Sequence, residues 1–110
     1  MALGEPYVRR CYNRFRRLYF ADATMPDFDE LDFEFAEAPD EWGSVEWDLH
    51  GNPSLSLHPV TRLYPAAIKE TLLHECIHLR LGPRYGHGRA FWREAARIHA
   101  LGAYREYFNG

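Results

Sequence analysis

The segment from Ala66 to Leu81 constrains the fold most, because its pattern predicts a helix that has to be buried. Gly82 and Pro83 come directly after it, and a glycine just past the last turn with a proline after it is a common way for a helix to end. Apolar residues lie on most sides of this helix: Ile68, Leu72, Leu73, Ile77, Leu79 and Leu81. Other elements therefore have to cover it, and polar groups inside it need partners.

Two further helices are predicted by apolar residues that recur at three- and four-residue steps. The first runs from Glu5 to Ala21, and the last from about Gly88 to Tyr107. The first helix carries arginines opposite its apolar stripe, which consists of Val8, Cys11, Tyr12, Phe15, Leu18 and Tyr19. The segment Met25-Pro26-Asp27 then predicts a turn after this helix.

Three short segments between the helices alternate apolar and polar residues, which predicts strands with one buried face. They are Leu31–Phe35, Val45–Leu49 and the segment around Leu55 and Leu57. Gly51-Asn52-Pro53 has the composition of a turn, so we expect the last two strands to form a hairpin. The order of helix, three strands, helix and helix predicts an α+β fold.

The chain of 110 residues has room for one domain with one modest core. Its two cysteines, Cys11 and Cys76, do not make a disulfide framework, and we expect Cys76 to be a buried thiol. No apolar run approaches the ~20 residues that span a bilayer, and the N-terminus lacks the apolar core of a signal peptide. We therefore expect a cytoplasmic monomer that does not contact membranes.

The formal charge of −3 is unevenly distributed along the chain. The stretch from Leu18 to Thr61 contains no Lys or Arg but holds eleven of the 16 acidic residues, while the rest of the chain carries all 13 basic ones. One interpretation is an acidic solvated surface beside a basic one. The other is a surface polarised for a charged partner. The arginines of the first helix could contact nucleic-acid phosphates, or they could simply form a solvated face.

The buried helix contains His74-Glu75-Cys76-Ile77-His78, the HExxH pattern. Residues four apart lie on one face of a helix, so two imidazoles at this spacing can share one metal ion. Zinc suits two imidazoles with one more ligand and an open position, and it lowers the pKa of its water to about 7. Glu75 lies beside that face and would act as general base on this water. The pattern predicts a zinc-dependent peptidase.

A third protein ligand is needed, and two candidates remain on the residues alone. His87 is flanked by Gly86 and Gly88, which let the backbone approach another helix closely. Glu94 comes seven residues later, about two helical turns or roughly 10 Å away, so the two are alternatives rather than co-ligands. Phe91 is expected to anchor the last helix in the core.

The segment Leu72–His78, together with Gly86-His87-Gly88-Arg89-Ala90-Phe91 beyond it, resembles the SprT-like (Spartan-like) zinc metallopeptidase domain. That family combines HExxH with a Gly-His-Gly segment that opens a helix and an aromatic residue four positions after its histidine. The first helix, the Met-Pro turn and the short strands also fit, so the resemblance covers nearly the whole chain. It implies a minimal zincin-like domain over residues 1–110, without the zinc ribbon that many members carry.

By this resemblance His74, His78 and His87 would be the zinc ligands and Glu75 the general base. In zincins the substrate usually lies extended along a sheet edge by strand addition. Because the strand around Glu46 and Asp48 is acidic, we expect a preference for basic, flexible protein segments. Candidates for stabilising the oxyanion are Tyr85, Arg89 and Tyr104.

Three alternatives stay open on the sequence. The first is a peptidase with Glu94 as third ligand, and the second is a non-catalytic, zinc-stabilised binding module. The third is a peptidase that DNA stimulates and that acts on DNA-bound proteins, as the best-known activity of the family implies. We expect His50 and His58 to be solvated and His99 to be partly buried, where it could support a zinc ligand.

Overall fold

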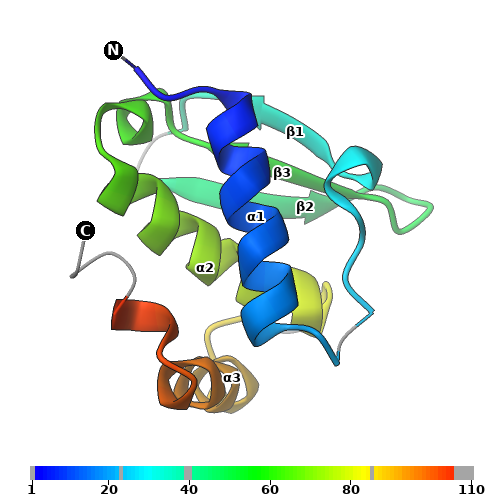
Figure 1. Cartoon of the computed structure of the whole chain (residues 1–110). Helices are drawn as coiled ribbons and strands as arrows, with labels where there is room; N and C mark the ends of the chain where they lie inside the picture. Colours follow the sequence, from blue (N-terminus) through cyan, green and yellow to red (C-terminus); the bar gives the residue numbers. More distant parts are fainter. Residues whose placement is uncertain (1, 23, 39–40, 85, 106–110) are drawn as a thin grey trace.

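The computed structural model describes residues 2–22, 24–38, 41–84 and 86–105. Within them the chain forms an α+β fold of three α-helices and one three-stranded mixed sheet (Figure 1). In chain order the elements are α1 Glu5–Tyr19, β1 Asp32–Phe35, β2 Gly43–Trp47, β3 Pro53–Leu57, α2 Pro65–Leu81 and α3 Arg89–Ala100. Short 3₁₀ turns occupy Phe28–Glu30, Pro59–Leu63 and Ala103–Arg105. The expected fold class is confirmed.

The sheet has the order β1-β3-β2, so β3 is central and β2 is an edge strand. The hairpin of β2 and β3 is confirmed as antiparallel, while β1 pairs with β3 in parallel. In this register Leu55 and Leu57 of β3, both buried, share one face with the partly buried Phe33, Phe35 and Val45. The opposite face is polar and consists of Asp32, Glu34, Ser44, Glu46, Ser54 and Ser56.

Helix α2 packs on the sheet through β2 and β3 and lies at the centre of the molecule. It contacts α1, β2, β3 and α3, as its apolar circumference predicts. Helix α3 crosses one end of α2 (Figure 1). None of the helices in the described part combines the length and the apolar character that a bilayer span needs.

Two predicted boundaries in the first half of the chain are wrong. Strand β2 ends at Trp47 instead of continuing to Leu49, because the Asp48 carboxylate accepts hydrogen bonds from the backbone N–H groups of His50 and Asn52 and closes a turn. Leu49 is fully exposed. Helix α1 ends at Tyr19 and leaves the side chain of Leu18 43% exposed, outside the core in which it was expected.

The predicted length of the last helix is also wrong. Helix α3 ends at Ala100, and Gly102 has a φ of +93°, a left-handed conformation that turns the chain away from the helix axis. The remainder of the predicted helix, as far as Tyr107, partly lies outside the described residues. Because α3 is shorter than predicted, its stability depends less on local helix propensity and more on its contacts with α2.

Candidate metal centre

One stripe of α2 carries the first two histidines. Ala67, Thr71, His74 and His78 recur at three- and four-residue steps, which places them along one side of the helix. The imidazole centroids of His74 and His78 lie 5.0 Å apart, one above the other. Most of the other residues of α2 between Ile68 and Leu79 are buried, whereas His74 and His78 are half-buried.

His87 approaches this stripe from the segment that precedes α3. Its Nε2 atom lies 2.9 Å from Nε2 of His74 and 3.0 Å from Nε2 of His78. The nitrogen atoms that the three residues offer all lie within 4.8 Å of one another. These three histidines are therefore close enough to bind one metal ion.

Hydrogen bonding alone does not account for this convergence. An imidazole nitrogen carries either one N–H or one lone pair in the ring plane, so it forms one well-directed hydrogen bond. Nε2 of His87 nevertheless approaches two ring nitrogens at nearly equal distance. Nitrogens at ~2.0–2.1 Å from a tetrahedral ion would be separated by roughly 3.3 Å, close to the separations found here. An all-imidazole donor set of this size fits a zinc-sized ion.

The surroundings keep two of these rings neutral. Burial, with smaller effects of repulsion from His78 and His87, lowers the pKa of His74 to about 4. Burial and repulsion from His87 also lower the pKa of His78. Because a metal binds only the neutral imidazole, these two histidines are in the metal-binding form at neutral pH.

Phe91, on the first turn of α3, supports all three rings. Its ring centroid lies 4.8 Å from that of His74, 5.0 Å from that of His78 and 4.9 Å from that of His87. Only 2% of Phe91 is exposed, which confirms its expected role as an anchor for α3. It thereby fixes the start of α3, and with it the segment that carries His87.

Glu75 adds an unusual buried carboxylate beside the histidines. Only 3% of the residue is exposed, and its Oε2 has no hydrogen-bond partner among the residues that the structure describes. Burial, with a further contribution from the charge of Glu41, raises the pKa of Glu75 to about 7. A carboxylate with such a pKa can both accept and donate a proton near neutral pH. Gly43 allows the close approach of β2, since a Cβ there would lie 3.2 Å from Cγ of Glu75.

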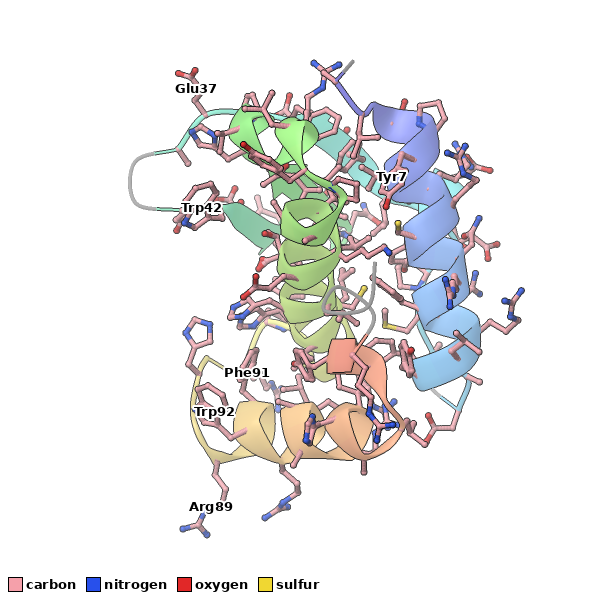
Figure 2. The ribbon with its side chains drawn as sticks, turned by 60° about the vertical axis from the view of Figure 1, so that its left-hand side comes forward. Tyr7, Glu37, Trp42, Arg89, Phe91 and Trp92 are labelled. Atoms are coloured by element: carbon pink, nitrogen blue, oxygen red, sulfur yellow. The ribbon has the colours of Figure 1, made fainter. Side chains whose placement is uncertain are left out.

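A cleft of about 680 Å³ opens in front of these groups. Its walls come from the stripe of α2, from the start of β2 with the residues before it, and from His87. Figure 2 shows Trp42 at the β2 side, with Phe91 and Trp92 at the start of α3. The lining residues are Glu41, Trp42, Gly43, Ser44, Val45, Trp47, Ala67, Glu70, Thr71, His74, Glu75, His78 and His87. The cleft is thus continuous with the three histidines.

Glu94, the other candidate for third ligand, is not brought to the histidines. Its carboxylate pairs with Arg80 of α2 at 3.0 Å and with Arg97 at 2.5 Å, and only 8% of the residue is exposed. Arg97 also donates to the backbone carbonyl of Tyr19 at the end of α1. Glu94 is therefore the centre of an ion-pair network that joins α1, α2 and α3.

Two further sequence candidates, Arg89 and Tyr104, lie outside the cleft. Arg89 is exposed and points away from the molecule (Figure 2), and Tyr104 does not line the cleft either. Tyr85 lies outside the described residues.

Cys76 is confirmed as a buried thiol, with a pKa that burial raises. The partial burial expected for His99 is wrong, because the residue is exposed.

His50 and His58 do not form a second metal site within the described residues. His50 lies in the exposed turn after β2, and Nδ1 of His58 accepts a hydrogen bond from the backbone N–H of Val60. The arginines of α1 are partly neutralised, since Arg9 pairs with Asp29 at 2.7 Å and Arg16 pairs with Asp27. This pairing favours the interpretation of the arginine stripe as a solvated face.

Sequence reasoning missed several residues of the cleft, above all Gly43, Glu41 and Glu70. Glu70 lies four residues before His74, so helical spacing could have indicated it. No spacing rule connects Glu41 or Gly43 to the histidines, because the loop before β2 reaches the cleft only through the packing of β2 on α2. For Gly43, which lies two residues before the strand predicted from Val45, the available signal was that a glycine beside a strand can mark a close approach of backbone to a neighbour. No protein-family model matches the chain, and no curated protein matches it either.

Proposed function

We propose that this protein is a zinc-dependent endopeptidase of the SprT-like type, with His74, His78 and His87 as ligands and Glu75 as general base. One observation carries the proposal. Three imidazole nitrogens converge at one wall of an open cleft, beside a buried carboxylate oxygen that has no partner. Leaving such an oxygen unpaired is costly to stability, and a role in proton transfer explains the cost.

Zinc, when bound, supplies Lewis acidity, which acidifies water and polarises a carbonyl group. Glu75 then performs both proton transfers. Its carboxylate removes a proton from the attacking water and passes it to the nitrogen of the leaving amine, so one residue is base first and acid second. The pKa of about 7 suits both steps, because the ionised and protonated forms are equally accessible near neutral pH.

Strand β2 provides the edge that an extended substrate would need. Asp48 donates its N–H to Asn52, and His58 donates to Trp42, so the even-numbered positions along β2 pair with β3. In an antiparallel ladder the bonding direction alternates. Gly43, Val45 and Trp47 therefore turn their N–H and C=O groups to the free edge, where a peptide can pair in the manner of strand addition.

The zinc assignment is tested by metal analysis of the purified full-length protein after loading and desalting. We expect one zinc per chain in the unmodified protein and a loss of tight binding in His87→Ala. Glu94→Gln is the matched control, since it changes the alternative ligand and should retain zinc. Loss of zinc in Glu94→Gln with retention in His87→Ala would overturn the ligand set.

The peptidase assignment is tested with Glu75→Gln, which keeps the size of the side chain and removes its basicity. We expect cleavage of an unfolded protein or a quenched peptide to fall by about 10²–10⁴-fold with zinc content unchanged. Cleavage that survives in zinc-loaded Glu75→Gln would contradict the mechanism. A zinc-loaded unmodified chain with no cleavage at all would instead indicate a zinc-stabilised binding module.

A further inference from the structure

The acidic residues that line the cleft are not those of the strands. Glu46 belongs to the polar face, and Asp48 to the turn beyond β2, so neither lines the cleft. The cleft is instead lined by Glu41, from the segment before β2, and by Glu70, from α2. The two acids that were expected to select the substrate, Glu46 and Asp48, therefore do not line the cleft, whereas Glu41 and Glu70 do.

Glu41 and Glu70 both line the cleft that contains the histidines and Glu75. Glu70 lies four residues before His74, one helical turn along the same side of α2. Glu41 lies near enough for its charge to act on Glu75. Both residues are exposed, and no ion pair with either is found in the described part of the chain. The two charges are available to a ligand.

Aromatic surface accompanies these carboxylates. Trp42 and Trp47 line the cleft, and Trp42 is 60% exposed. His58 holds this residue in place. Its backbone N–H donates to the backbone carbonyl of Trp42 at 2.8 Å, and its ring centroid lies 6.1 Å from that of the indole. A tryptophan held in this way at an open wall offers a ring face to a flat or cationic group.

We propose that this part of the cleft is a subsite for an arginine or lysine side chain of the substrate, read by Glu41, Glu70 and Trp42. The proposal rests on the proposed peptidase function and names its substrate class. The carboxylates complement the cationic head group, while the indole covers its planar or aliphatic part. The unpartnered Glu75 oxygen in the same cleft is a further, independent sign that this cavity is built to receive a polar ligand.

Binding is measured with zinc-loaded Glu75→Gln, so that the result does not depend on cleavage. The probes are ten-residue peptides of Gly, Ala and Ser that carry one arginine at successive positions, each paired with a citrulline peptide of equal size. Tryptophan fluorescence reports binding, because two tryptophans line the cleft. We expect one position at which arginine binds about five- to tenfold more tightly than citrulline, with the difference reduced in high salt.

Three variants in the same background locate the subsite. Glu70→Gln and Glu41→Gln should each lower the preference for arginine about two- to fivefold. Glu34→Gln, on the polar face of the sheet, is the charge-matched control and should leave the preference unchanged. A loss of preference in Glu46→Gln, with none in Glu41→Gln or Glu70→Gln, would place recognition on the polar face and overturn the proposal.

The two hypotheses fail separately. If the unmodified protein cleaves arginine and citrulline peptides at equal rates, the subsite is refuted and the peptidase stands. If arginine is preferred in binding but nothing is cleaved, the subsite stands and the peptidase is refuted. Equal binding of every peptide by Glu75→Gln overturns the subsite whatever the cleavage result.

Discussion

The molecule contains two buried glutamates, Glu75 and Glu94, in opposite electrostatic situations. Glu94 is surrounded by arginines that satisfy its charge, and it holds three helices together. Glu75 is more deeply buried, has an oxygen without a partner, and has a pKa that is raised to about 7. Both were candidate site residues from the sequence, and their burial is similar.

The two glutamates differ in the groups that surround their carboxylates. A buried carboxylate that is fully paired contributes to structure. A buried carboxylate left unpaired at the wall of a cleft costs stability and gains reactivity. The comparison therefore predicts that changes to Glu94 appear in the free energy of unfolding, whereas changes to Glu75 appear in chemistry and in the pH dependence of stability.

The largest effect on stability is expected from Glu94→Ala. Removing the carboxylate leaves Arg80 and Arg97 without their shared partner, so we expect the free energy of unfolding to fall by about 2–4 kcal/mol. Urea unfolding of the zinc-free protein measures this loss. Glu34→Ala changes an exposed acid on β1; it is the control and should change stability by less than about 0.5 kcal/mol. Equal losses in both variants would remove the distinction between a paired and a solvated carboxylate.

The second largest effect is expected in the stability of the zinc-free protein, which should depend on pH because of Glu75. Because its folded-state pKa is raised to about 7 from the ordinary value of 4.5, the folded chain keeps a proton that the unfolded chain releases between these values. Folding is therefore disfavoured progressively as pH rises from about 4.5 to 7. Relative to the unmodified protein, Glu75→Gln should gain up to about 3 kcal/mol across this window.

Urea unfolding at pH 5 and at pH 8, with a metal chelator present, measures this change. The histidines contribute equally to both proteins, so they cancel in the difference. Glu94→Gln should show no comparable gain with rising pH. A difference between Glu75→Gln and the unmodified protein that stays constant with pH would mean that Glu75 is ionised throughout, and the contrast with Glu94 would be lost.

The smallest effect concerns the packing that positions Glu75. In Gly43→Ala the new methyl group would lie 2.7 Å from Cγ2 of Thr71 and 3.2 Å from Cγ of Glu75. We expect a loss of about 1–2 kcal/mol in stability, because β2 must move away from α2. Thr71→Ser removes the nearest contact and should recover part of the loss in the double variant. Additive effects of the two changes would show that this contact does not constrain the strand.

The helices and the strand alternation could be predicted because both depend on local periodicity. A buried face repeats every 3.6 residues in a helix and every second residue in a strand, and α1, α2 and β1 to β3 all obey these rules. The ends were less predictable. Asp48 closes a turn with its side chain, and Gly102 adopts a left-handed conformation, and both override the apolar pattern that continues past them.

The sequence by itself determined that His74 and His78 share one side of a buried helix, because four-residue spacing fixes that relation within a single element. Only the tertiary structure decided between His87 and Glu94, and it did so through contacts between α2, α3 and the segment that joins them. It also decided which acids line the cleft, since the pairing of β2 with β3 turns Glu46 to the opposite face. The physical reason is the same in both cases: local hydrogen bonding sets the period of an element, whereas packing between distant segments sets its neighbours.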